Sequence, residues 1–392
     1  MSQAINSNLK STNTTKNEKK SIFKIIQVSQ LLNQLETSVL IDVRSPLEFQ
    51  EDHIPGAVNL PVLDDEERRQ IGTLYKANSF AARHEGAVLI SANIAKKILP
   101  QIKQISVSAD SFEFSQSSSF HKPNTQFVIY CWRGGMRSSS LSSVIDMIGY
   151  HTSRLDGGYR SFRRLVQKTL YGGSGDDTTC SIEQLRCISI HGPSGSGKTE
   201  LLTELRNSGN SILFLEQYAN HKGSLLGGDF TTQPSQKWFE TLLWNDLRLQ
   251  NLFNTDLKLC FVEGESRKIG RLTLPTCFYD RMKAGSRIWV ELPIEERARR
   301  LAFEYSENDE VLLKRLNRMK AYFSKPVFQE IIDSINKGER YRASYLLLAE
   351  HYDRYYKRNS PEITGNYLAV FREPTFALLK DRLLHWVNQN TQ

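Results

Sequence analysis

The sequence predicts an α/β protein with two parallel-sheet domains, the second of which has a largely helical C-terminal part. Two apolar runs, at 127–130 and 185–190, are each followed by a glycine-containing loop and then by a helical segment. Repeated strand–loop–helix units are typical of parallel sheets. Residues 171–177, between the two units, are polar and glycine-rich without an apolar period, which indicates a linker.

A chain of 392 residues is long enough for two domains. The expected organisation is a disordered tail at 1–21, a first domain at 22–172, a linker at 173–184 and a second domain at 185–390. The tail is rich in Ser, Asn, Thr and Lys and has no apolar centre, so it is not expected to act as a secretory signal.

Composition narrows the class of protein. Hydrophobic residues make up 39% and charged residues 24%, as in soluble globular proteins, and no apolar run reaches the ~18–20 residues that span a bilayer. The five cysteines include no CxxC pair, so we expect neither a zinc site nor a disulfide framework, and we expect a cytoplasmic protein. A net charge of +8 suits a polyanionic partner, although simple solubility also explains it.

The elements of the first domain follow from apolar runs and turn residues. Residues 39–44 predict a buried strand that Ser45-Pro46 ends, and 55–61 predict a turn into a second short strand. Helical spacing covers 81–99, and the Ser-rich stretch at about 104–126 indicates a surface insertion. In the second domain, helices are expected at 297–305, 312–323, 341–356 and 375–387.

Cys131 is the strongest candidate for a reactive residue. It lies between the strand at 127–130 and the helix expected at 139–148, with Gly134 and Gly135 in the intervening loop. Glycines allow backbone N–H groups to turn toward the sulfur, and a helix N-terminus favours negative charge. We therefore predict a nucleophilic Cys131 in an active-site loop that also contains Arg133, Gly134, Gly135 and Arg137.

The same loop is compatible with two kinds of chemistry, a persulfide carrier or a cysteine phosphatase. Cys131 and Arg137 have the Cys-x5-Arg spacing with which phosphatases grip phosphate oxygens. Against this interpretation, the His that usually precedes a phosphatase cysteine is replaced by Tyr130. The loop is one residue longer than in many sulfur carriers, so it could admit a larger anion.

A second motif predicts a phosphate site. Residues 192–199 match GxxxxGK[ST] between a strand and a helix, so backbone N–H groups would cradle a diphosphate that Lys198 neutralises, with Thr199 as a ligand for Mg²⁺. Glu263 ends the strand at 259–263, where Asp is usual, which leaves nucleotide hydrolysis open. The predicted phosphate-binding residues are Gly192, Ser194, Gly195, Ser196, Gly197, Lys198, Thr199 and Glu263.

A basic cluster follows the cysteine loop. Within fifteen residues lie five cations with Asp156 as the opposing charge, interleaved with Tyr159 and Phe162. This pattern fits a phosphate-backbone footprint and equally fits a solvated helix face. The candidate tRNA-binding residues are Arg154, Arg160, Arg163, Arg164 and Lys168.

Residues 42–49 and 53–61, together with the Cys131 loop, resemble the signature of rhodanese domains, which carry sulfur as a cysteine persulfide. In such domains the residues equivalent to Asp42 and Arg44 are structural. The whole of 22–390, apart from the Ser-rich insertion, resembles the tRNA 2-selenouridine synthases. The stretches that carry this second resemblance are 72–76, 131–138, 157–160, 221–224, 233–236 and 262–270.

This resemblance implies a transferase that replaces sulfur by selenium on wobble 2-thiouridine of tRNA. Selenophosphate would supply selenium, and geranyl diphosphate would form an S-geranyl intermediate, with Cys131 required. It implies no tightly bound cofactor, no membrane association and a selenophosphate-producing enzyme as a partner. An apolar groove with Trp238, Phe239 and Trp244 is the suggested place for the geranyl tail. The alternatives are a rhodanese-type sulfurtransferase coupled to an NTPase, a Cys-x5-Arg phosphatase fused to a kinase, and a non-catalytic tRNA-binding module.

Overall fold

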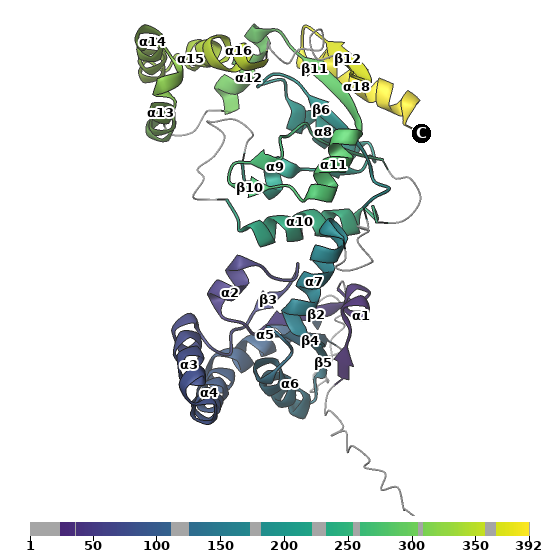
Figure 1. Cartoon of the computed structure of the whole chain (residues 1–392), viewed down its shortest axis with the longest axis vertical. Coiled ribbons are helices and arrows are strands. Elements are labelled where there is room, and N and C mark those ends of the chain that lie inside the picture. The colour runs from purple at the N-terminus through teal and green to yellow at the C-terminus, as the bar shows by residue number, and fades with distance from the viewer. Residues whose placement is uncertain are drawn as a thin grey trace, which may run out of the picture. The chain divides into compact units, whose positions relative to one another are not determined.

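The computed structural model describes residues 24–35, 37–110, 125–172, 182–221, 233–253, 259–304, 309–356 and 366–391 (Figure 1). The expected tail lies outside these residues, as do most of the expected linker and residues 111–124 of the Ser-rich stretch. The chain forms two compact units. Residues up to 45 and 58–159 form the first unit, and residues 46–57 and 160 onward form the second.

The first unit contains a five-stranded sheet in the order β1-β5-β4-β2-β3. All neighbouring strands run parallel, as the sequence predicts. The strands are β1 (Lys24–Ile26), β2 (Ser38–Asp42), β3 (Val58–Asn59), β4 (Gln126–Tyr130) and β5 (His151–Leu155). The central strand β4 is buried from Phe127 to Tyr130, which explains why it reads as a continuous apolar run.

Helices of the first unit cover this sheet. They are α1 (Val28–Leu32), α3 (Asp65–Ala77), α4 (Ser79–Asn93), α5 (Leu99–Asp110) and α6 (Met136–Ile148), and α3 lies beside α4 (Figure 1). A π-helical turn, η1 (Ile94–Ile98), joins α4 to α5, so the helix expected at 81–99 continues into the Ser-rich stretch. Ile90, Ile94 and Ile98 of this continuous helix pack with Phe127 and Leu141 in one apolar core.

Asp42 and Arg44 form a buried ion pair at the end of β2. Two oxygens of the Asp42 carboxylate accept hydrogen bonds from the Arg44 guanidinium, at 3.0 Å from Nε and 2.6 Å from Nη2. The guanidinium also stacks over the ring of Tyr159, at 4.0 Å from its centroid. Because buried charges persist only when paired and hydrogen-bonded, these contacts support the structural role expected for both residues.

The second unit has its own five-stranded parallel sheet, in the order β12-β11-β6-β8-β7. Its strands are β6 (Arg186–His191), β7 (Ile212–Leu213), β8 (Leu259–Glu263), β11 (Ser286–Glu291) and β12 (Ala369–Arg372). A short antiparallel pair, β9 (Lys268–Ile269) and β10 (Leu272–Thr273), forms a separate ribbon. The central strand β6 leads directly into the predicted phosphate loop.

Helices make up most of the remaining second unit. They include α8 (Lys198–Asn207), α9 (Leu215–Tyr218), α10 (Gln236–Leu249), α11 (Thr276–Ala284) and α18 (Phe376–Asn390). At one end of the unit gather α12 (Ile294–Glu304), α13 (Asp309–Arg318), α14 (Lys325–Asn336), α15 (Arg340–Leu347) and α16 (Asp353–Tyr356) (Figure 1). These helices share an apolar core, as the expected helical C-terminal part requires. Within the described ranges, no helix is long and apolar enough to cross a bilayer.

The segment 46–57, which carries part of the rhodanese signature, packs in the second unit. It contains α2 (Pro46–Glu51) and His53, whose ring stacks between Phe49 and Trp238 with centroid distances of 3.8 and 4.0 Å. An ion pair of 2.7 Å between Lys237 and Glu51 adds to this contact. The helix α7 (Gly158–Tyr171) also begins in the first unit and continues in the second.

Candidate functional site

The thiol of Cys131 lies directly after β4 and before α6. Its sulfur accepts a hydrogen bond of 3.2 Å from the N–H of Gly135 and lies 3.2 Å from the hydroxyl of Ser138. Cys131 is 3% exposed, so these two groups replace most of its contact with water. The sequence predicts backbone N–H groups turned toward this sulfur, and Gly135 at the start of α6 supplies one.

The loop depends on two glycines with left-handed backbone conformations. Gly134 has φ +69° and Gly158, from the start of α7, has φ +58°. A Cβ on Gly158 would lie 2.2 Å from the carbonyl oxygen of Cys131, so a side chain there would displace the loop. The N–H of Tyr159 holds the same carbonyl at 2.8 Å. The start of α7 therefore fixes the backbone that presents the thiol.

The two loop arginines differ in exposure. Arg133 is exposed and Arg137, in the first turn of α6, is half-buried. The ring centroids of Trp132 and Tyr159 lie 5.3 Å apart, so the Tyr159 ring covers one side of Trp132. The loop therefore combines a buried sulfur with an exposed cation two residues away, an arrangement that can attract an anion toward the thiol.

The phosphate loop occupies the position that its motif predicts, between β6 and α8. Gly195 and Gly197 have φ values of +80° and +75°, and Lys198 begins the helix. The ammonium group of Lys198 donates a hydrogen bond of 3.1 Å to the carbonyl of Gly192, so it bends back over the loop. A Cβ on Gly192 would lie 2.1 Å from the carbonyl oxygen of Val290 in β11, which makes glycine necessary there.

Two buried polar atoms of this region have no hydrogen-bond partner among the described residues, the hydroxyl of Ser196 and one carboxylate oxygen of Glu263. The other oxygen of Glu263 accepts a bond of 2.7 Å from the N–H of Leu215. Since a buried polar group without a partner is costly, these atoms fit a site that a polar ligand completes. Thr199 is exposed at the start of α8.

The carboxyl groups of Glu216, Glu263 and Glu265 lie close to one another, and that of Glu265 also lies close to Lys198. Burial, followed by the charge of Glu216, raises the pKa of Glu263 to about 8, and the same two causes raise the pKa of Glu265 to about 8. Burial and the nearby cations Arg287 and Lys198 lower the pKa of His191 to about 4. At neutral pH Glu263 and Glu265 therefore retain their protons and His191 is neutral, so that Lys198 supplies positive charge beside the loop.

The raised pKa of Glu263 predicts how stability depends on pH. Folding keeps this carboxyl protonated, so its contribution is present below the unfolded pKa of 4.5 and is lost as pH rises through about 8. The Glu263→Gln variant, which cannot ionise, should therefore gain stability relative to the wild type between about pH 5 and 8, by up to ~1.4 kcal/mol per pH unit, and the gain should level off above about pH 8, where the folded carboxyl is ionised as well. Urea unfolding of the full chain in EDTA measures this difference.

The exposed carboxyl of Glu295 provides the control for this measurement, because Glu295→Gln should leave the pH dependence unchanged. If the free energy of unfolding depended on pH in the same way for Glu263→Gln and the wild type, a raised pKa at Glu263 would be contradicted.

The structure adds two arginines of α12 to the surroundings of the phosphate loop. Arg297 is buried, pairs with Asp353 at 2.7 Å and donates to the carbonyl of Ser194 at 3.2 Å. Arg300 stacks over Phe376 at 3.9 Å and lies 2.8 Å from the position of a Cβ on Gly197. The sequence held no signal for these contacts, because about one hundred residues separate the loop from α12.

The five candidate tRNA-binding cations have different surroundings. Arg154, on β5, donates to the hydroxyl of Ser139. Arg163 pairs with the buried Glu240 and lies 3.8 Å from the buried Asp52. Arg160, Arg164 and Lys168 are exposed. Of the five candidates, these three are both exposed and located in the part of α7 that belongs to the second unit.

The apolar groove suggested for a geranyl tail does not form as expected. Phe239 and Trp244 are 0% and 1% exposed, and Trp238 stacks on His53. The apolar face of α10 packs into the core, because an amphipathic helix buries its apolar side against the sheet. Phe239 and Trp244 therefore line no open groove.

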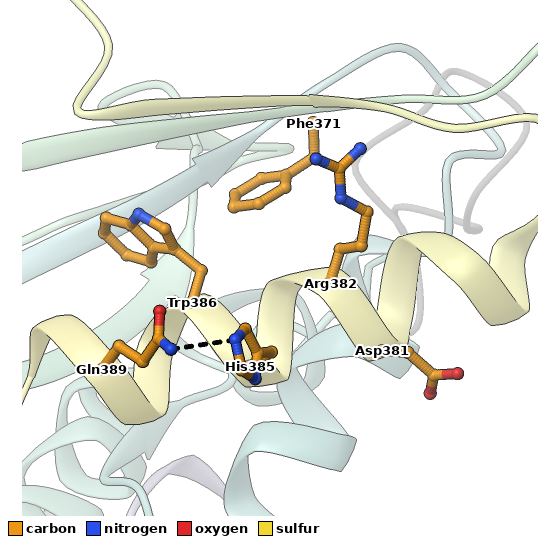
Figure 2. A pocket seen from close by; sticks show the side chains of 6 residues that line it. All are labelled: Phe371, Asp381, Arg382, His385, Trp386 and Gln389. Carbon is orange, nitrogen blue, oxygen red and sulfur yellow. Dashed lines mark hydrogen bonds between the residues drawn. The ribbon is translucent and has the colours of Figure 1, made fainter.

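A separate hollow of about 310 Å³ lies between β12 and α18 (Figure 2). Its lining residues are Phe371, Asp381, Arg382, His385, Trp386 and Gln389. Trp386 packs edge-on against Phe371, and Gln389 bonds His385 at 2.9 Å, while Asp381 is directed away from the others (Figure 2). None of the lining residues belongs to the cysteine or phosphate loop, so we assign this hollow no role in their chemistry.

The two loops define the class of the protein, a rhodanese-like unit followed by a P-loop unit. The family model for the rhodanese-like domain matches residues 27–165, and the model for the tRNA 2-selenouridine synthase AAA domain matches residues 185–340.

Curated relatives named tRNA 2-selenouridine synthase include the protein of Nitrosomonas eutropha, which is 36% identical over 68% of this chain and 62% of its own length. The protein of Bdellovibrio bacteriovorus is 33% identical over 74% of this chain and 70% of its own length. The relative from Shewanella denitrificans is 31% identical over 81% of this chain and 84% of its own length. The chain belongs to the tRNA 2-selenouridine synthase family. The match spans less than two thirds of the Nitrosomonas protein's length.

Proposed function

We propose that this protein is a tRNA-modifying transferase that converts wobble 2-thiouridine to 2-selenouridine, with selenophosphate as selenium donor and geranyl diphosphate as alkyl donor. Membership of the family supports the tRNA substrate. The observation that carries the proposal is the pairing, in one chain, of a buried thiol held by Gly135 and Ser138 with a phosphate loop that ends in Lys198.

The first step is alkylation of the base. The thio sulfur attacks C1 of the geranyl group, a C–S bond forms, and the C–O bond to diphosphate breaks with the electron pair on the departing diphosphate. The residues of the 192–199 loop hold this diphosphate with backbone N–H groups, and Lys198 stabilises its developing charge. Mg²⁺ bound at Thr199, with Glu263 nearby, would neutralise further charge on the leaving group.

The second step replaces sulfur. A thione is a poor leaving group, whereas an S-alkylated base is more electrophilic at C2 and releases a neutral thiol. The selenium of selenophosphate adds at C2, the C–S bond breaks and geranylthiol leaves with one proton, and water then cleaves the P–Se bond to release phosphate and 2-selenouridine. Cys131 either holds selenophosphate beside C2, or attacks C2 itself, expels geranylthiol and is then displaced as thiolate by the selenium. The exposed cations Arg160, Arg164 and Lys168 of α7 bind tRNA phosphates.

Nucleoside mass spectrometry of tRNA tests this function. The full chain is incubated with 2-thiouridine-containing tRNA, geranyl diphosphate and selenophosphate. We expect 2-thiouridine to disappear, an S-geranyl nucleoside to form transiently, and 2-selenouridine to accumulate. The same tRNA without its thio group is the control and should remain unchanged. Turnover of thiosulfate or a phosphate ester without any change in tRNA would contradict the proposal and favour the sulfurtransferase or phosphatase alternative.

A further inference from the structure

We infer that a second tRNA-binding surface lies on the helical part of the second unit, across α13, the short 3₁₀ helix η4 (Lys320–Tyr322) and the start of α14. We call it the α13–α14 basic surface, and its cations are Lys314, Arg315, Arg318, Lys320 and Lys325. The inference rests on the proposed function, since it assigns a binding surface for the tRNA that the two loops act on.

Charge is the first observation. Residues 311–329 contain these five cations and no acidic residue. Two carboxylates that flank this stretch pair with cations outside it, Asp309 with Arg340 at 2.8 Å and Glu330 with Arg342 at 2.6 Å. An acid-free stretch is therefore a local source of positive potential, which attracts a polyanion.

Packing keeps these cations on the surface. The apolar residues of the same stretch, Leu312, Leu316, Met319 and Phe328, are buried in the core that α12 to α15 share. Lys314, Arg318, Lys320 and Lys325 are exposed. Since Lys314 and Arg318 are four residues apart on α13, they lie on one helix face, opposite the buried leucines.

An aromatic side chain accompanies the cations. Tyr322 is 58% exposed and lies between Lys320 and Lys325 in the sequence, and its ring packs 5.1 Å from that of His351. Unpaired nucleobases stack on such rings, and cations on either side hold the flanking phosphates. Cations together with a supported aromatic ring favour RNA over a lipid surface, which would instead require a broad apolar face.

The test compares full-length variants for binding to tRNA at two or more salt concentrations. Combined Lys314→Glu, Arg318→Glu and Lys320→Glu substitutions should weaken tRNA binding at least about tenfold and lower the slope of log K against log salt by about two to three. The KM for tRNA should rise, while kcat at saturating tRNA stays within about twofold. Tyr322→Ala should weaken binding without changing the salt slope.

The matched control carries the same charge change at dispersed exposed sites, Lys97→Glu, Lys283→Glu and Lys337→Glu. Equal effects of the control and the surface variant would overturn the inference, because net charge alone would explain them. If the surface variant kept the affinity and salt slope of the wild type while the wild-type chain modifies tRNA, the inference would also be overturned and the proposed function would remain intact. Loss of binding to anionic vesicles, with tRNA binding retained, would assign the surface to lipid instead.

Discussion

Replacing Cys131 by serine is expected to lower the rate of 2-selenouridine formation by at least about a thousandfold. Serine is smaller than cysteine and can make the same hydrogen bonds with Gly135 and Ser138, so the loop should keep its shape. Its hydroxyl is a far weaker nucleophile than a thiolate. Geranyl transfer should persist within about threefold, because the diphosphate is bound by the other loop.

Nucleoside mass spectrometry follows both steps in the same reaction. Cys277→Ser is the matched control, since this half-buried cysteine lies on α11 and belongs to neither loop. Circular dichroism of both variants checks that they fold. Unchanged selenation by the Cys131→Ser variant, with geranyl transfer also unchanged, would remove Cys131 from the mechanism.

Replacing Lys198 by alanine is expected to reduce geranyl transfer, and affinity for inorganic diphosphate, by at least about a hundredfold. Lys198 is the cation of the phosphate loop, and the leaving diphosphate gains charge as its bond to carbon breaks. Lys198 donates a hydrogen bond to the carbonyl of Gly192, and the loss of this surface-loop contact should leave the fold largely unchanged. Titration calorimetry with inorganic diphosphate measures binding separately from chemistry.

Lys283→Ala, at an exposed position on α11, is the matched control and should behave like the wild type. Retention of both diphosphate affinity and geranyl transfer in Lys198→Ala would exclude the phosphate loop as the diphosphate site. Together, the Lys198 and Cys131 variants separate alkylation from selenium transfer.

Much of the fold could be predicted because its signals are local. The strands β2, β4 and β6 are short apolar runs, and the loops after β4 and β6 contain the glycines that their turns need. A parallel sheet buries its central strands on both faces, so these strands are visible without knowledge of their neighbours. The two loops are predicted in the same way, whereas the structural role of Asp42 and Arg44 is implied by the resemblance to rhodanese domains.

Fewer features of the candidate site could be predicted from the sequence, because many of its contacts join segments that are far apart in the chain. The approach of Arg300 to Gly197 depends on how α12 packs, and the raised pKa of Glu263 depends on its burial near Glu216. Periodicity shows which face of an element is apolar but does not show what will cover it. For the same reason, the sequence suggests an apolar groove at Phe239 and Trp244, whereas the structure buries both side chains in the core.

The sequence by itself determined two parallel-sheet units, a cysteine before one helix and a lysine at the start of another. Each of these features forms through interactions between residues that are neighbours in the sequence. Only the tertiary structure decided that 46–57 packs in the second unit and that Arg163 pairs with Glu240. It also decided that the acid-free stretch 311–329 exposes Lys314, Arg318, Lys320 and Lys325 to solvent. The burial of a side chain and its pairing with a partner depend on interactions between segments far apart in the chain. No local sequence pattern specifies these interactions.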